Sequence, residues 1–525
     1  MTTKRSISSI ALLLTSVSAI IGSGWLFSSY YASTMAGPGA LLSWLVAGVA
    51  IIIVAFVFGE ICSMIPVTGS STRIPHFTHG TVVSFIFSWI IWLSYAALAP
   101  TEVQAVIQYL TFYFPSLTHT DAGLTRHGYL VAMYLMLLIS TINVYSLRWL
   151  IRSNNILTLV KIIIPIFIAI IIITSCFAHG HTLYPTNSSF LPMGIHGMLV
   201  AISSGGIVFA FNGFKQAAEM AGEAKKPHFA LPFALIGSVT FCLLLFLLLQ
   251  TAFLSSLTQA NVANGWQHIN LPDSVSPLAA VLTQNNLNSL LPILYICALI
   301  APLAAALMYC GSSSRSLYGM SKNGYIFSIF QKLNPKGNPV NAIIANFAIG
   351  MFMFTPLPGW DSMVSFLSSV LAVTYSIGPV SLLALREQMP EYKRLFRLPF
   401  AKVWANLAFY ICTLLTFWCG WEIIYKLSIA LLVGLIVLVF YQLKPGEHKK
   451  IALNWFASIW MWIYFAGLTL ISYLGSFGGG KNILPFGWDF VIIALFSIAV
   501  MWLALKFKLP AHETAEHINT SLAQN

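Results

Sequence analysis

The sequence predicts an all-α protein that crosses a membrane many times, and three observations lead to this prediction. Of the 525 residues, 58% are hydrophobic and only 8% are charged, against roughly 25% charged residues in an ordinary soluble domain. The mean hydropathy is +0.83. Apolar runs follow one another along the chain, each near the ~20 residues that a helix needs to cross a bilayer. This composition excludes a soluble enzyme, a secreted disulfide-rich scaffold and a disordered protein.

Fourteen apolar runs are candidate membrane spans, and the connections between them are too short to hold a soluble domain. The division between the eleventh and twelfth spans depends on a few residues around Gly420 and Glu422. The spans lie near residues 9–33, 40–64, 82–114, 128–147, 153–178, 196–219, 229–256, 288–318, 340–357, 362–385, 402–420, 423–442, 452–476 and 487–506.

The basic residues indicate how the chain is oriented. With the N-terminus inside, the inside segments hold 21 of the 26 Lys and Arg residues, and the outside segments hold three, Arg126, Lys426 and Lys481. The remaining two, Lys161 and Lys215, lie within spans. This asymmetry follows the positive-inside rule, so we expect both termini in the cytoplasm. The formal charge of +12 is spread between apolar runs rather than gathered in a patch, so it does not indicate nucleic-acid binding.

Two spans contain glycines where a helix is expected to break. The first carries Gly22 and Gly24 on either side of Ser23, and the sixth carries Gly205, Gly206 and Gly213. An unwound segment would expose N–H groups at the start of the second half-helix, which can bind a carboxylate. Close packing of helices through small residues explains the same glycines equally well. Breaks five spans apart are typical of an inverted-repeat transporter, with spans one to five and six to ten as the repeats.

Several short motifs occur in a fixed order between about Ser18 and Pro399. They are Ile21-Gly22-Ser23-Gly24; Gly59-Glu60 with Pro66-x-x-Gly69; Phe209-Ala210-Phe211-Asn212-Gly213-Phe214 with Glu219, Gly222-Glu223 and Lys226-Pro227; Ser314-Arg315-x3-Gly319-Met320-x3-Gly324; and Ala384-Leu385-Arg386, Pro390 and Arg394-x2-Arg397-x-Pro399. In this order the motifs resemble those of the amino acid–polyamine–organocation (APC) permeases, which share the LeuT-type fold. The Ile-Gly-Ser-Gly-Trp form and the fourteen spans are similar to the bacterial aspartate/glutamate:proton branch.

The resemblance implies a 5+5 inverted repeat with helices 1 and 6 broken, plus about four extra C-terminal spans. We therefore expect a transporter core in residues 1–400, additional spans in 401–507 and a polar, flexible cytoplasmic tail in 508–525. The resemblance also implies where the substrate binds. Backbone N–H groups in the first break would hold the α-carboxylate, and carbonyls in the sixth break would hold the α-amine. These segments are Ile21, Gly22, Ser23 and Gly24, and Phe209, Ala210, Phe211, Asn212 and Gly213, with Trp25, Tyr95 and Lys215 as pocket or gating candidates.

Charges within spans are costly, about 3 kcal/mol on insertion scales, so each needs an explanation. Lys161 in the fifth span fits the position where proton-coupled relatives carry a lysine in place of a sodium ion; alternatively, it extends to the cytoplasmic surface. Glu102 in the third span is either a proton carrier or a structural hydrogen-bond partner. Lys215 faces the cavity or pairs with Glu219, and it stands where relatives often carry an acid. Glu60 is expected to be an interfacial charge.

These observations predict a secondary transporter that imports an acidic or neutral amino acid by proton symport and alternating access. An exchanger without net proton movement, and a non-transporting membrane sensor, are the alternatives. The sequence contains no Walker A motif and no metal-ligand spacing, so we expect neither ATP hydrolysis nor a cofactor. The expected partners are the amino acid, protons and membrane lipid, and the expected location is a bacterial inner membrane.

Overall fold

The computed structural model describes residues 7–67, 69–145, 147–185, 189–272, 275–443 and 451–523. Over these residues the chain forms helices and two isolated β-bridges, with no strand, which confirms the predicted all-α class. Five of the basic residues used for the orientation, Lys4, Arg5, Lys444, Lys449 and Lys450, lie outside the described residues.

The helices follow the predicted spans closely. The first half of the chain contains α1 (Ser9–Ile20), α2 (Gly24–Ala36), α3 (Ala40–Met64), α4 (Ser70–Thr111), α5 (Arg126–Tyr145) and α6 (Leu147–Ala178). Next come α7 (Gly194–Ser203), α8 (Ile207–Ala210), α9 (Gln216–Glu219), α10 (Pro227–Ser256), α11 (Pro277–Gln284), α12 (Leu291–Lys322), α13 (Val340–Met353) and α14 (Gly359–Gln388). The last are α15 (Ala401–Phe417), α16 (Trp421–Leu443), α17 (Trp455–Leu474), α18 (Trp488–Lys506) and α19 (Ala511–Ala523).

Ten helical segments of the described chain are long and apolar enough to cross a membrane, or eleven if the bent α7–α9 segment counts as one span. Each of the fourteen predicted spans falls on a helix or on a broken set of helices. However, α13 and α15 have only 14 and 17 residues, shorter than the ~20 that a straight crossing needs. The multi-pass architecture is therefore confirmed, and the count of fourteen stays a prediction.

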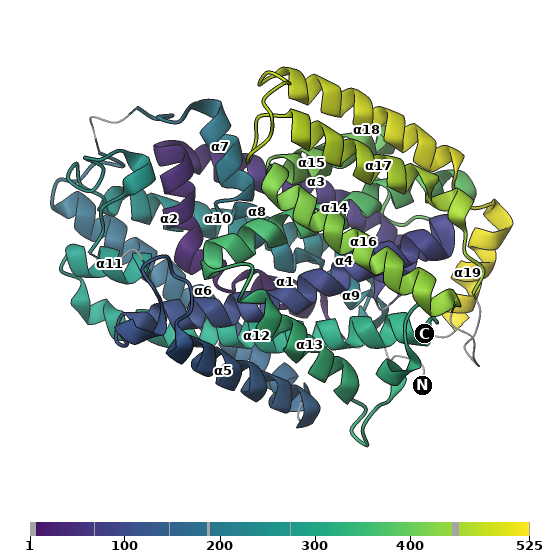
Figure 1. Ribbon diagram of the computed structural model, residues 1–525, viewed down its shortest axis with the longest axis horizontal. Helices are drawn as coiled ribbons and strands as arrows, with labels where there is room; N and C mark the ends of the chain where they lie inside the picture. Colours follow the sequence, from purple (N-terminus) through teal and green to yellow (C-terminus); the bar gives the residue numbers. More distant parts are fainter. Residues whose placement is uncertain are drawn as a thin grey trace.

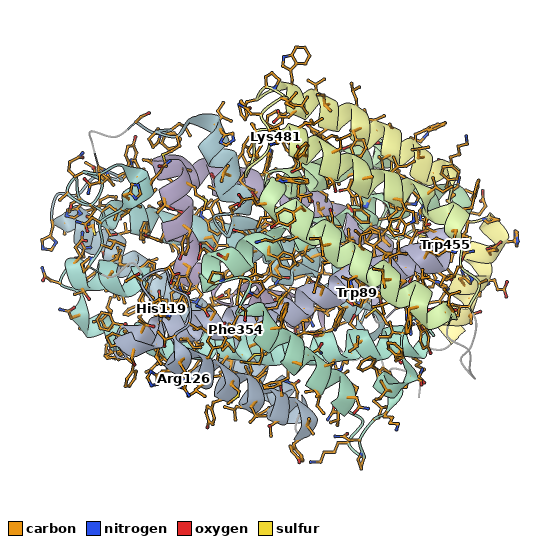
Figure 2. All side chains as sticks on the ribbon, in the orientation of Figure 1. Trp89, His119, Arg126, Phe354, Trp455 and Lys481 are labelled. Atoms are coloured by element: carbon orange, nitrogen blue, oxygen red, sulfur yellow. The ribbon has the colours of Figure 1, made fainter. Side chains whose placement is uncertain are left out.

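Two helices, α4 and α14, form the centre of the bundle (Figure 1). In α14, every residue of the most apolar 18-residue stretch is buried. In α5 and α6, only one-third of the residues in the corresponding stretch are buried, as expected for helices that face lipid. Trp89 of α4, labelled in Figure 2, donates a hydrogen bond of 2.9 Å to the Ala430 carbonyl of α16. The C-terminal helices α15 to α18 thus pack on the centre from one side (Figure 1).

Gly80 divides α4 into two segments of different direction. Its φ of 78° lies outside the helical range, in a region that glycine adopts without a Cβ penalty. The Thr81 N–H beyond the kink donates to Asn454 Oδ1 at 3.1 Å. The predicted third span, 82–114, therefore corresponds to the second segment, which carries Glu102.

The C-terminal tail, which the sequence predicted to be flexible, forms a packed helix over the described residues. Residues 511–523 form α19, which packs on the first turns of α4. Arg73 donates to Ser521 Oγ at 3.1 Å, the His76 and His517 rings stack with centroids 4.6 Å apart, and Ile518 is completely buried. The polar composition of the tail did not indicate that α19 has an apolar face, which packs on the rest of the protein.

Candidate functional site

The first span is interrupted between α1 and α2. Helix α1 ends at Ile20, and α2 begins at Gly24. Ile21 has φ −82° and ψ 81°, outside the helical range, and the Gly22 N–H donates to the Ile20 carbonyl in place of a helical partner. The interruption therefore places the carbonyl end of α1 and the N–H end of α2 in the interior of the protein.

Glu102 of α4 occupies the N–H end of this break. The Ser23 N–H donates to Glu102 Oε2 at 2.8 Å, and the Glu102 side chain is 2% exposed. A Cβ at Gly22 would overlap Glu102 Oε1, so glycine is required there by the close approach of the carboxyl group. The acid sits at the positive end of the α2 dipole, where a carboxylate is stabilised.

Lys161 of α6 occupies the other end of the break. Its Nζ donates to the Ser18 carbonyl at 3.1 Å, and the residue is completely buried. The amine thus satisfies a carbonyl in the last turn of α1, where the helix dipole is negative and a cation is favoured. This geometry contradicts the alternative, in which the Lys161 side chain extends to the cytoplasmic surface.

The sixth span is interrupted by a series of short turns. Helix α7 ends at Ser203, Gly206 adopts φ 83°, and 3-10 turns at Asn212–Lys215 separate α8 from α9. The segments on either side, Gly194–Ala210 and Asn212–Glu219, are bent by 43°. The positive φ of Gly206 falls in the region that favours glycine, so the turn explains why the residue at this position is glycine.

The two breaks pack directly on each other. A Cβ at Gly213 would overlap the backbone of Ala19 and Ile20, and a Cβ at Gly24 would lie 3.1 Å from Ala210 Cβ. Ser16 Oγ donates to the Phe214 carbonyl at 3.2 Å and accepts from the Ala217 N–H at 3.1 Å. Unwinding and close packing, the two explanations of the glycines, therefore both apply here.

Tyr309 of α12 joins the two breaks and was not singled out from the sequence. Its hydroxyl donates to the Ala19 carbonyl at 2.9 Å and accepts from Asn212 Nδ2 at 3.1 Å. The ring of Tyr95 stacks on that of Tyr309 with centroids 6.1 Å apart. Tyr95 thus lies beside the break, and its role in a pocket stays a prediction.

Trp360, in the first turn of α14, covers the first break and was also missed. Its Nε1 donates to Ser23 Oγ at 2.8 Å, and its ring stacks on Phe27 and Tyr31 with centroids 4.9 and 5.6 Å away. The Phe209 ring meets it edge-on at 5.6 Å. A Trp that follows Pro-Gly at the end of a span can equally be an anchor at the membrane interface. No local sequence pattern distinguishes such an anchor from a residue that covers the break.

Three predicted site residues have other surroundings. Phe211 packs on Trp44 and Phe246, whose ring centroids are 5.8 and 5.6 Å away on α3 and α10. Lys215 donates to Thr374 Oγ1 at 2.9 Å and lies 4.8 Å from the centre of the Tyr375 ring, so its amine contacts α14. Trp25 is buried, and among the described residues its Nε1 has no hydrogen-bond partner. Their roles in binding stay predictions.

Glu60 is completely buried, so its assignment as an interfacial charge is wrong. Arg386 binds both carboxylate oxygens, with Nε–Oε1 and Nη2–Oε2 distances of 2.9 and 2.7 Å. The Leu398 N–H donates to Oε2 at 2.7 Å. This bidentate geometry is the strong form of a charge-assisted hydrogen bond, and it fixes the segment between α14 and α15 against α3.

Known proteins match the chain over nearly its full length. Residues 7–422 match the family described as amino acid permease. The glutamate/serine transporter AimA of Bacillus subtilis is 32% identical over 99% of this chain and 97% of its own. The aspartate-proton symporter of the same organism is 30% identical over 97% of both chains. A branched-chain amino acid permease, BcaP, is 25% identical over 85% of this chain and 94% of its own.

The match confirms the resemblance drawn from the motifs, and transport of amino acids, rather than enzymatic catalysis, is the activity that these relatives share. The chain therefore belongs to the amino acid permease family of the APC superfamily and is a multi-pass membrane transporter.

Proposed function

We propose that this permease imports an acidic or neutral amino acid together with a proton. The observation that carries the proposal is the carboxyl group of Glu102, which binds Ser23 N–H at 2.8 Å. That N–H belongs to the segment proposed to hold the substrate carboxylate. A protein carboxylate and a substrate carboxylate would thus compete for the same end of α2.

Proton binding at Glu102 would decide this competition. An ionised carboxylate accepts hydrogen bonds strongly, whereas the protonated acid is a weaker acceptor. Protonation would release the Ser23 N–H to the incoming substrate, and loss of the proton on the other side would return Glu102 to the site. Lys161 would hold the carbonyl end of α1 through this cycle, in place of a metal cation.

Two observations support an acidic or neutral substrate. The buried ammonium groups of Lys161 and Lys215 would repel a cationic side chain at short range. Two of the relatives described above, at 32% and 30% identity, are named for glutamate and serine, and for aspartate and protons. We place the carrier in residues 1–400, with inverted repeats that rock against each other, additional spans in 401–507 and both termini in the cytoplasm.

Uptake into proteoliposomes tests the proposal. Labelled glutamate, aspartate and serine should accumulate when an inward proton gradient is imposed in sodium-free buffer, and excess arginine should not compete. Glu102→Gln should retain exchange of substrate across the membrane but lose the response to the gradient. Glu391→Gln, which changes an exposed loop carboxyl, is the matched control and should behave as the unmodified protein.

Three results would contradict the proposal. A requirement for sodium would exclude proton coupling, and gradient-driven accumulation by Glu102→Gln would remove Glu102 from it. Exchange without any response to the gradient in the unmodified protein would indicate the exchanger instead.

A further inference from the structure

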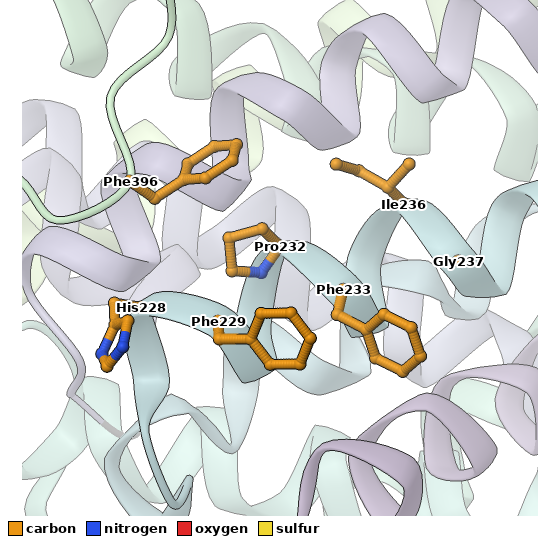
Figure 3. Close-up of a pocket in the computed structure, with 7 residues that line it drawn as sticks. All are labelled: His228, Phe229, Pro232, Phe233, Ile236, Gly237 and Phe396. Atoms are coloured by element: carbon orange, nitrogen blue, oxygen red, sulfur yellow. The ribbon is translucent and has the colours of Figure 1, made fainter.

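An apolar groove opens on the outside of the bundle, away from the two breaks. It has a volume of about 340 Å³ and lies where the first turns of α10 meet the segment between α14 and α15. In Figure 3, Phe396 reaches over Pro232 from that segment, and the rings of Phe229 and Phe233 lie side by side along α10. His228 lies at one end of the groove and Ile236 toward the other.

The lining of this groove is suited to a hydrocarbon chain. Phe229 and Phe233 are 58% and 41% exposed, and their rings stack nearly parallel with centroids 5.6 Å apart. Exposed phenyl rings beside an unfilled apolar groove are unfavourable in water. In a membrane protein such a surface contacts lipid, so an acyl chain is the natural occupant.

Basic residues lie close in sequence to the residues that line the groove. Lys225 and Lys226 immediately precede α10, and Lys393, Arg397 and Lys402 lie in or just after the segment that carries Phe396. All five are exposed, and within the described ranges none lies within 4.0 Å of a carboxylate. Glu391 is the one acid between residues 388 and 421. The two segments that line the groove are therefore flanked by five exposed basic residues, which we take as its basic rim, and none of them is in a described salt bridge.

We propose that this groove binds an anionic phospholipid of the cytoplasmic leaflet. One acyl chain lies between Phe229, Phe233 and Phe396, and the phosphate group contacts the basic rim. The positive-inside orientation places this rim on the cytoplasmic side, where basic pockets between spans recognise anionic headgroups. The inference rests on the membrane location and the predicted orientation of the chain and is independent of proton coupling.

The position of the groove links the lipid to the helices that carry the breaks. A Cβ at Gly59 would lie 3.5 Å from both Phe396 and Pro232, so α3 packs at this glycine against two residues that line the groove. The next residue, Glu60, holds the Leu398 N–H at 2.7 Å, two residues beyond Phe396. Helix α10 also packs along α1 and α3. A lipid in the groove therefore ties the α14–α15 segment to the helix that supports the first break.

Native mass spectrometry of the full chain in mild detergent tests the site, with phosphatidylglycerol and phosphatidylcholine of identical acyl chains as probes. Phosphatidylglycerol should bind at least tenfold more tightly and raise the midpoint of thermal unfolding more. Each basic residue near an anionic surface contributes about a fivefold change in affinity. The combined variant Lys225→Gln, Lys226→Gln, Arg397→Gln should lose the preference for phosphatidylglycerol.

A second set of basic residues supplies the matched control. Lys322→Gln, Lys332→Gln, Lys336→Gln removes three exposed charges near α12 and α13 and should leave lipid preference unchanged. Phe229→Ala, Phe233→Ala should weaken both lipids alike, because it changes the acyl-chain surface and not the rim. Equal affinity for the two lipids in the unmodified protein, or an equal loss in both charge variants, would overturn the proposal.

Discussion

The two helix breaks have the same role in the fold but are stabilised by different chemistry. In the first break, a carboxyl group from α4 binds the N–H end of α2, and an ammonium group from α6 binds the carbonyl end of α1. In the sixth break, the contacts come from the neutral groups of Asn212, Tyr309 and Ser16. Proton transfer at Glu102 can therefore change the contacts of the first break directly, whereas Asn212, Tyr309 and Ser16 do not titrate near neutral pH.

This difference suggests that the two breaks have different roles in transport. The first break contains the groups through which a proton could act on substrate binding, and the sixth holds the first in register through close packing. Substitutions in the sixth break should then affect folding or all substrates equally. Substitutions in the first should change the response to a proton gradient.

Gly213→Ala should have the largest effect. The new Cβ would overlap the backbone of Ala19 and Ile20, and neither segment can yield without moving a half-helix. Overpacking typically costs about 1–3 kcal/mol, and more where backbone must move. We expect loss of transport and a lower midpoint of thermal unfolding in detergent. Gly319→Ala, at a position with open space, is the control, and normal transport by Gly213→Ala would disprove the tight contact.

Lys161→Ala should abolish gradient-driven accumulation while some exchange survives. Without the ammonium, the Ser18 carbonyl loses its donor and the buried Glu102 loses a nearby positive charge. We expect accumulation of labelled substrate to fall more than ~10-fold, because removing one of two neighbouring buried charges costs about 3–5 kcal/mol. Lys506→Ala, at the end of α18, is the matched lysine variant. Accumulation that persists in Lys161→Ala would separate this residue from coupling.

Trp360→Phe should have a moderate effect confined to substrate affinity. The smaller ring keeps much of the stacking on Phe27 and Tyr31 but loses the hydrogen bond to Ser23 Oγ. One hydrogen bond contributes about 0.5–1.5 kcal/mol, so the apparent affinity for substrate should change about 2- to 10-fold. Trp488→Phe, which changes an exposed side chain, should leave affinity unaltered. An unchanged affinity in Trp360→Phe would show that the indole does not control access.

The sequence predicted the positions of the breaks better than their partners. Glycines within apolar runs mark a break because few other residues weaken a helix there, so Gly22, Gly24 and Gly213 could be found locally. Lys161 could be found because a charge within a span is costly. By contrast, Tyr309 and Trp360 come from α12 and α14, hundreds of residues away, and only tertiary packing brings them to the break. Glu60 was misjudged because its partner, Arg386, is equally distant in the chain.

Ser16→Ala should have the smallest effect and gives the sharpest test of the comparison. The hydroxyl joins α1 to the second half of the sixth span through two hydrogen bonds, to Phe214 and Ala217. Its loss should cost about 1 kcal/mol of stability and lower the unfolding midpoint by a few degrees. The dependence of uptake on the proton gradient should stay the same, because neither Glu102 nor Lys161 is touched. If Ser16→Ala changed the gradient response as strongly as Lys161→Ala, coupling would involve both breaks, and the division between a proton-responsive break and a structural one would be wrong.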